Sequence, residues 1–191
     1  MRNRVRAFVA ILLSEEVRAV VAAEIARLRP LGRSVRWVSP ENLHLTLRFL
    51  GERTPEELDL IRDGLSEVAE GAAQFTLSFH GLGAFPGLAR PRVFWVGVTT
   101  GSEDAKLLHS RLEAALARRT IPPEERPFSA HLTIGRARTL THLSALQEAI
   151  AREGQRGFGE LRVGSVSLMR SELSPAGPRY TEIKAFPFGL A

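Results

Sequence analysis

The chain alternates between stretches in which apolar residues run together and stretches in which they recur every three or four positions. The first pattern predicts strands and the second predicts helices. Arg4–Leu13 is an apolar run typical of a buried strand, and the next segment, Ser14–Leu28, is expected to be a helix capped by its serine. A second helix is predicted to begin at Thr54-Pro55-Glu56-Glu57, a capping box with proline at the first helical position, and to end at Gly71.

The same two patterns continue along the rest of the chain. Further strands are predicted at Val35–Val38, Leu43–Leu50, Phe75–Phe79, Arg92–Val98, Phe128–Gly135, Gly159–Met169 and Arg179–Phe186, and further helices at Ser102–Arg119 and Leu143–Glu153. Helices that fall between pairs of strands are typical of an α+β protein with antiparallel sheets, and not of a doubly wound parallel sheet. No segment has the composition of a linker, so residues 1–191 are expected to form a single domain of two lobes that share one interface.

One tripeptide occurs twice. His-Leu-Thr, followed each time by a large aliphatic residue, contributes His44 and Thr46 in the first copy and His131 and Thr133 in the second. Side chains alternate between the two faces of a strand. Each copy is therefore expected to bury its aliphatic residues on one face and to present an imidazole and a hydroxyl on the other.

Two imidazoles and two hydroxyls are suited to the hydrolysis of a phosphodiester. One imidazole can activate water while the other protonates the leaving oxygen, and the hydroxyls can donate to the oxygens on which charge builds up. This chemistry needs no metal and suits a strained ester such as a ribose 2′,3′-cyclic phosphate. A single His-x-Thr is more often a cross-strand pair without chemistry, but the repeat favours the catalytic interpretation. A metal site is disfavoured because neither His-x-His nor His-Glu-x-x-His occurs.

Charge and composition add a class of substrate. The net charge is +5, and 24 of the 26 basic residues are arginine. Arginine presents a planar set of donors that matches phosphate, which favours a polyanionic substrate, although a GC-rich genome would give the same excess. The absence of cysteine excludes disulfides and a cysteine nucleophile. Neither an export signal nor a membrane span is apparent, so a cytoplasmic protein is expected.

Five segments that cover most of the chain, in order, carry a resemblance to a known family. They are Trp37–Gly51, Gly81–Pro86, Pro91–Val98, His131–Arg136 and Leu168–Leu173. With its two His-x-Thr motifs, the chain resembles the 2H phosphoesterases, and within them the RNA 2′,3′-cyclic phosphodiesterases, also called LigT-like 2′-5′ RNA ligases. Ala130 departs from the pattern, because relatives often carry proline before the second histidine. This difference leaves the four motif residues complete.

The resemblance implies a fold and a reaction. The fold is bilobal with pseudo-twofold symmetry, with two antiparallel sheets, helices on the outer faces, and a cleft lined by both motifs. The reaction is the hydrolysis of RNA 2′,3′-cyclic phosphate ends to 2′-phosphates without metal or other cofactor, together with joining of RNA ends through a 2′-5′ linkage. We expect His131 to be the proton acceptor and His44 the proton donor, with Thr46 and Thr133 binding phosphate. Pseudo-symmetry leaves the opposite assignment of the two histidines open.

Two further residues, and one histidine outside the motifs, complete the expectations. Arg136 resembles the substrate-contacting arginine of the family; strict alternation would direct it to the core unless Gly135 ends the strand. Phe49 stands where relatives can stack a base, yet alternation places it in the core, so core packing is expected and a base contact is the alternative. His109, among charged residues of a helix, is expected to be solvated.

Two other functions stay open at the level of the sequence. An RNA-binding module would use the arginines for salt-dependent binding without turnover. A different 2H phosphodiesterase would act on small cyclic nucleotides. The intact pair of motifs favours an enzyme that acts on RNA ends bearing a 2′,3′-cyclic phosphate, and we expect a monomer with no obligate protein partner and no membrane partner.

Overall fold

The computed structural model describes residues 4–175 and 177–189, which form one antiparallel sheet with helices on its outer side. The strand order is β7-β4-β5-β6-β3-β1-β8-β9, and β2 pairs with β6 beside β3. The strands are β1 (Val5–Leu12), β2 (Val35–Trp37), β3 (His44–Arg53), β4 (Phe75–Phe85), β5 (Val93–Val98), β6 (His131–Ala137), β7 (Gly157–Val163), β8 (Ser165–Ser174) and β9 (Gly177–Pro187). The helices are α1 (Glu15–Leu28), α2 (Pro55–Glu70), α3 (Ser102–Ala117) and α4 (Ser144–Arg152), with short 3-10 turns η1 (Arg29–Leu31) and η2 (Pro40–Asn42).

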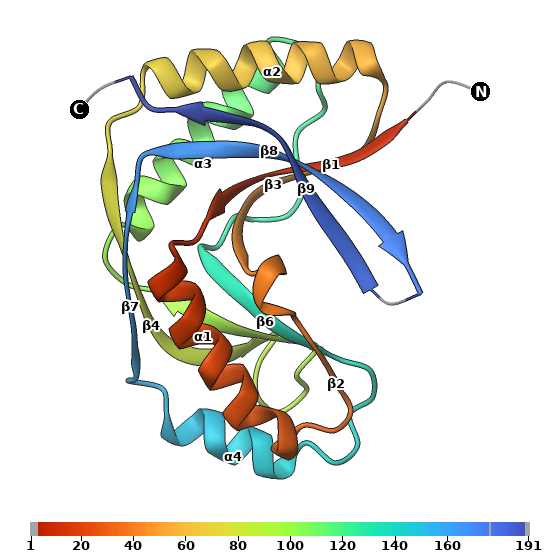
Figure 1. Ribbon diagram of the computed structural model, residues 1–191, viewed down its shortest axis with the longest axis vertical. Helices are drawn as coiled ribbons and strands as arrows, with labels where there is room; N and C mark the ends of the chain where they lie inside the picture. Colours follow the sequence, from red (N-terminus) through yellow and green to blue (C-terminus); the bar gives the residue numbers. More distant parts are fainter. Residues whose placement is uncertain (1–3, 176, 190–191) are drawn as a thin grey trace.

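The sheet has two halves that meet at β3 and β6. Among the described residues, one residue pair joins these two strands, Leu45 with Leu132. The half that contains β3, β1, β8 and β9 is covered by α2 and α3, and the half that contains β6, β5, β4 and β7 is covered by α1 and α4 (Figure 1). The expected α+β fold of two lobes with outer helices is confirmed. The structure adds that the two antiparallel sheets are continuous through this single pair.

The ends of the helices follow the local signals in the sequence. The Thr54 hydroxyl accepts from the backbone N–H of Glu57 at 3.3 Å, and the Glu57 carboxylate accepts from the N–H of Thr54 at 2.8 Å, which completes the predicted capping box before α2. Ser14 caps α1 by accepting from the N–H of Val17 at 3.4 Å. Both helices therefore begin where their caps were predicted.

One predicted strand is wrong. Gly159–Met169 was expected to be continuous, but it contains two strands that belong to opposite halves of the sheet: β7 pairs with β4, and β8 pairs with β1. Gly164 alone separates them, and both flanks carry strand-type residues, so periodicity gives no sign of the break. The residues that the structure describes therefore form nine strands, one more than the eight that the sequence predicts.

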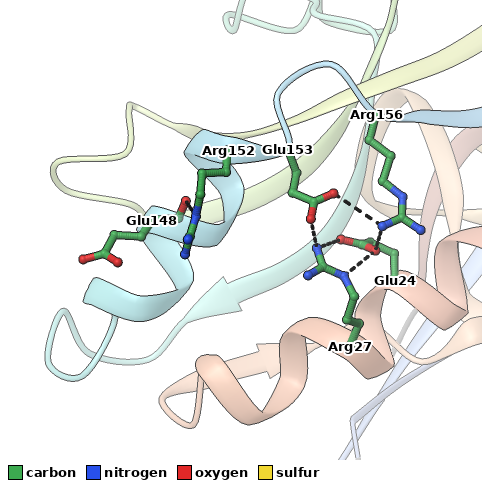
Figure 2. A network of polar contacts seen from close by, with 6 residues as sticks. All are labelled: Glu24, Arg27, Glu148, Arg152, Glu153 and Arg156. Atoms are coloured by element: carbon green, nitrogen blue, oxygen red, sulfur yellow. Dashed lines mark hydrogen bonds and ion pairs between the residues drawn. The ribbon is translucent and has the colours of Figure 1, made fainter.

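A network of charges fastens α1 to the segment between α4 and β7 (Figure 2). The carboxylate of Glu24 is buried, and it accepts from Nε and Nη2 of Arg27 at 3.0 and 2.6 Å and pairs with Arg156 at 3.2 Å. Glu153 joins the same two arginines at 3.0 and 3.4 Å.

Within the described part of the chain, no helix is both long and apolar enough to cross a membrane.

Candidate active site

The two His-Leu-Thr motifs lie side by side at the junction of the two halves. Their central leucines, Leu45 and Leu132, are Cα partners and are fully buried. The motif residues on the opposite face are partly exposed: His44, Thr46, His131 and Thr133. The predicted alternation is confirmed. If the antiparallel register is extended by one residue in each direction, each histidine lies beside the threonine of the other motif.

The Nδ1 hydrogen bonds of the two imidazoles are equivalent. Nδ1 of His44 lies 2.7 Å from the carbonyl oxygen of Asn42, and Nδ1 of His131 lies 2.7 Å from that of Ser129. A carbonyl oxygen only accepts, so Nδ1 carries the hydrogen in both rings and Nε2 is left to exchange a proton. Nε2 of His44 lies 2.9 Å from the Thr46 hydroxyl, which donates to it when the ring is neutral.

The surroundings of both imidazoles favour the neutral ring by lowering the pKa. Burial lowers the pKa of His44 below the ordinary value of 6.5, and the nearby His131 lowers it further, against the opposing effect of its hydrogen bond to Asn42. Burial likewise lowers the pKa of His131, and the positive charge of Arg136 adds to this, against the hydrogen bond to Ser129. A bound phosphate anion has the opposite effect and would raise the pKa of the imidazole nearest to it.

Aromatic rings hold the two imidazoles in place. His44 packs against Phe8 with ring centroids 4.8 Å apart, and meets the edge of Tyr180 at 5.3 Å and 89°. His131 meets Phe85 at 5.0 Å and 81°. Because each ring is fixed both by its Nδ1 hydrogen bond and by an aromatic neighbour, the direction of each Nε2 is set before any ligand binds.

A cavity of about 1740 Å³ opens beside the motifs. The cavity is lined by His44, Thr46, Thr133 and Arg136, and His131 does not contribute to its wall. Further wall residues come from η2, β2 and the β8–β9 hairpin, which in Figure 1 lie on either side of the junction of β3 and β6. Residues on both strands of the β8–β9 hairpin line the cavity.

Phe49 is not in the core. The pairing of β1 with β3 shifts at Leu47, which adds one residue to β3 and reverses the alternation beyond it. As a result Arg48 is 2% exposed, and Phe49 is 50% exposed and lines the cavity. The expectation of core packing was wrong, because it assumed that alternation continued without a bulge.

The same irregularity occurs in β6. The pairing of β5 with β6 shifts at Ile134, so Gly135 is buried and Arg136 is exposed into the cavity. The strand does not end at Gly135 but continues to Ala137. Arg136 therefore reaches the site, as the family resemblance implied, through a bulge rather than through the end of the strand.

Other residues at the site were not found from the sequence. The Asn42 side chain donates to the backbone carbonyl oxygen of Pro178 at 2.9 Å and so connects η2 to the hairpin, while the backbone carbonyl oxygen of Asn42 accepts from His44. Tyr180 packs on the same imidazole. Asn42 is next to the motif in the chain, but its bond to Pro178 joins residues 136 positions apart, and only the fold brings Tyr180 to His44.

His109, expected to be solvated, is partly buried. Its Nδ1 lies 3.0 Å from the carbonyl oxygen of Leu47, and its ring stacks on Phe128 with centroids 4.5 Å apart. It therefore supports the bulge in β3 from behind.

Nowhere in residues 4–175 and 177–189 do three or more His, Asp or Glu side chains form a group that could hold a metal ion.

A sheet with two His-x-Thr motifs paired at its centre, both facing one basic cavity, defines the class of two-histidine phosphoesterases. The family described as the 2′-5′ RNA ligase superfamily matches residues 17–175. The chain belongs to this superfamily, which confirms the resemblance found in its sequence.

Full-length relatives support this membership. The RNA 2′,3′-cyclic phosphodiesterase of Methanothermobacter thermautotrophicus is 36% identical over 183 residues, which cover 96% of this chain and 98% of the relative. A crystal structure of a protein from Thermus thermophilus superposes with a TM-score of 0.82 at 33% identity, and covers 97% of this chain and 98% of that one. Escherichia coli LigT complexed with 3′-AMP has a TM-score of 0.78 at 26% identity, and covers 97% and 99%.

Proposed function

We propose that this chain hydrolyses RNA 2′,3′-cyclic phosphate ends to 2′-phosphates. The observation that carries the proposal is the Leu45–Leu132 pair, which brings together two imidazoles, each held through Nδ1, beside one arginine-lined cavity. Relatives of the same length are named RNA 2′,3′-cyclic phosphodiesterase, and E. coli LigT has been crystallised with a nucleotide, 3′-AMP.

The two histidines divide the proton transfers. His131 accepts a proton from water through Nε2, and the water oxygen forms a bond to phosphorus. The bond from phosphorus to O3′ breaks, and His44 gives the proton on its Nε2 to O3′, which leaves a 2′-phosphate and a free 3′-hydroxyl. If a 5′-hydroxyl takes the place of water, the same steps give the 2′-5′ linkage to which the name of the superfamily refers.

The other site residues bind the substrate. Thr46 and Thr133 donate hydroxyl hydrogens to the non-bridging oxygens, and the Arg136 guanidinium offsets their charge in the transition state. Phe49, exposed on the cavity wall, offers a face on which the terminal base stacks. Because residues of one chain form both motifs and line the cavity, we propose that a monomer, acting as one domain in the cytoplasm, is sufficient.

The test uses a short RNA that ends in a 2′,3′-cyclic phosphate, incubated with the protein and EDTA, with the product identified by phosphorus NMR. A 2′-phosphate is the expected product. His44→Asn and His131→Asn should each lower kcat roughly 10²–10⁴-fold. His142→Asn, at an exposed position, should have the kcat of the wild-type protein. A 3′-phosphate product would overturn the role of O3′ as the leaving group.

The two alternatives give different results in the same assay. Binding of the RNA without turnover would indicate a binding module. Turnover of adenosine 2′,3′-cyclic phosphate without turnover of RNA would indicate a phosphodiesterase for small cyclic nucleotides. Loss of activity with EDTA would contradict the metal-independent mechanism.

A further inference from the structure

Two arginines face each other beside the proposed catalytic site. Arg36 on β2 and Arg136 on β6 are Cα partners, and both are exposed and line the cavity. Residues paired directly across antiparallel strands share one face, with Cβ atoms about 5 Å apart, and like charges at such positions repel each other. In the described residues, neither guanidinium takes part in an ion pair.

More arginines continue this basic surface outward. Arg138 follows β6; its backbone N–H donates to the carbonyl oxygen of Ser34 at 2.8 Å, and its exposed side chain lines the same cavity. Arg33 precedes β2 and also lines the cavity. The acidic residues of the cavity wall are carried by other elements, η2 and the segment before β6: Glu41, Glu124 and Glu125. The β2–β6 side of the cavity is therefore cationic.

The position of Arg36 relative to the motifs suggests what it binds. Arg36 pairs with Arg136, which lies four residues from Leu132 along β6. At the rise of a strand, this puts the pair of arginines about 13 Å from Leu132, at the centre of the site. Arg136, its partner at the same register, is close enough to His131 to influence its pKa. Arg36 therefore lies at the same level along β6 as Arg136 but on the neighbouring strand β2, where its long side chain can reach a phosphate next to the one that Arg136 contacts.

We propose that Arg36 binds the phosphate on the 5′ side of the terminal nucleotide, so that the site selects ends of RNA strands over nucleosides that carry only a cyclic phosphate. The inference rests on the proposed function. A phosphate between two guanidinium groups replaces their repulsion with charge-assisted hydrogen bonds. Arg138 and Arg33 extend the surface toward the next phosphates of the strand.

The test compares two substrates that differ by one group: adenosine 2′,3′-cyclic phosphate with and without a 5′-phosphate. The wild-type protein should have the higher kcat/KM on the 5′-phosphorylated compound. Arg36→Gln should lower kcat/KM on that compound about 10- to 100-fold, mainly through KM, and should leave the other compound unchanged. Arg162→Gln removes an exposed strand arginine on β7, outside the cavity, and serves as the matched control.

Two outcomes would overturn the proposal: equal losses on both substrates, or no loss on either. Because the substitution relieves a repulsion, the Tm of Arg36→Gln should be unchanged or higher, so loss of folding is not the expected cause of lost activity. Arg36→Lys keeps the positive charge but lacks the planar guanidinium group. Its kcat/KM on the 5′-phosphorylated compound should therefore lie between those of the wild-type protein and Arg36→Gln.

A binding measurement keeps this inference separate from the proposed function. Binding of a 2′-phosphorylated oligoribonucleotide is titrated against salt, and Arg36→Gln should lower the slope of log K against log salt by about 0.7, the value for one phosphate contact on a single strand. If neither cyclic phosphate is hydrolysed, the proposed function is wrong. If the salt slope of Arg36→Gln equals that of the wild-type protein, Arg36 does not contact a phosphate and this inference is wrong.

Discussion

Phe49 and Arg136 occupy equivalent positions in the two motifs. Each follows its motif threonine by three residues, and each is exposed into the same cavity because a bulge intervenes, at Leu47 in β3 and at Ile134 in β6. One half of the molecule thus places an aromatic ring where the other places a guanidinium. The two lobes supply complementary contacts, a flat apolar surface for a base and a positive charge for a phosphate.

Replacement of Phe49 by alanine tests this division. Stacking of a base on an aromatic side chain contributes about 1–3 kcal/mol, so Phe49→Ala should raise KM roughly 5- to 150-fold for an RNA end with a 2′,3′-cyclic phosphate. The side chain is half exposed, so the Tm should change little. Steady-state kinetics with thermal unfolding measures both.

Leu107→Ala provides the control, because Leu107 is equally exposed, 51% against 50%, but lies on α3 outside the cavity. It should leave KM unchanged. If Phe49→Ala instead lowers the Tm and leaves KM unchanged, Phe49 has a packing role and the base contact is wrong.

These bulges mark the limit of what the sequence predicts. The orientation of the motif residues follows from local alternation, and the caps of α1 and α2 follow from local hydrogen bonding, so both can be predicted from the sequence. The bulge at Leu47 depends on the register of β1 against β3, and the neighbouring Arg48 is buried because α3 and the segment after it supply partners. Such contacts join residues far apart in the chain, and periodicity carries no record of them.

The paired arginines show the same limit from another side. Arg36 precedes Trp37 in a short run that reads as an ordinary strand, and its charge has no special meaning there. Only the register of β2 against β6 sets it opposite Arg136. Composition indicated a phosphate ligand for the protein as a whole, but only the fold selects which arginines lie at the site.

The pH dependence of kcat/KM follows from the lowered pKa values of His44 and His131. The free protein reacts when one imidazole is neutral and the other protonated. Both pKa values lie below 6.5, so above that pH both rings are neutral and the proton donor is lost. We expect a bell-shaped profile of kcat/KM with its maximum below pH 6.5, and a profile of kcat displaced to higher pH, because the bound phosphate raises the pKa of its neighbour.

Arg136→Gln refines the same measurement. It removes a positive charge that lowers the pKa of His131, so the limb that reports on this histidine should move up toward 6.5. A wild-type kcat/KM that continues to rise to pH 8 would contradict the assignment of both rings as neutral in the free protein.

Arg48 is expected to be needed for stability beneath the motif. It is 2% exposed, forms an ion pair with Glu113 and donates to the carbonyl oxygen of Pro122, while Glu113 accepts from the N–H of Glu124 at 3.3 Å. Glu124 in turn accepts from the N–H of Phe49 at 3.2 Å. The Glu113 carboxylate is largely buried, and Arg48→Met leaves it without its cation. The substitution should lower the free energy of unfolding by about 3–5 kcal/mol in urea titrations.

Two companion variants show whether the ion pair is the cause. Arg48→Met with Glu113→Gln removes both charges and should recover part of the loss, which a double-mutant cycle measures. Arg62→Met breaks an exposed pair with Asp59 on α2 and should cost less than about 1 kcal/mol. If Arg48→Met costs no more than Arg62→Met, the buried pair contributes little to stability.

The Glu24 network should respond differently to the loss of its cations and of its anion. The side chains of Arg27 and Arg156 are 40% and 44% exposed and remain hydrated without Glu24, whereas the Glu24 side chain is only 1% exposed. Glu24→Gln should therefore cost about 1–3 kcal/mol of unfolding free energy. Arg27→Gln with Arg156→Gln leaves a buried carboxylate without a cation and should cost about 3–5 kcal/mol, more than the sum of the two single changes.

The decisive variant adds Glu24→Gln to the double arginine variant. It removes the stranded charge, so the triple variant should be more stable than the double variant, although it has lost one more native side chain. Lys106→Gln, which breaks an exposed pair with Glu103 on α3, should have no measurable effect. A triple variant less stable than the double variant would mean that the Glu24 carboxylate stabilises the fold even without its two cations, because glutamine keeps the shape of glutamate. Because the buried carboxylate holds α1 against the segment between α4 and β7, the same variants should change stability while kcat stays close to the wild-type value (Figure 2).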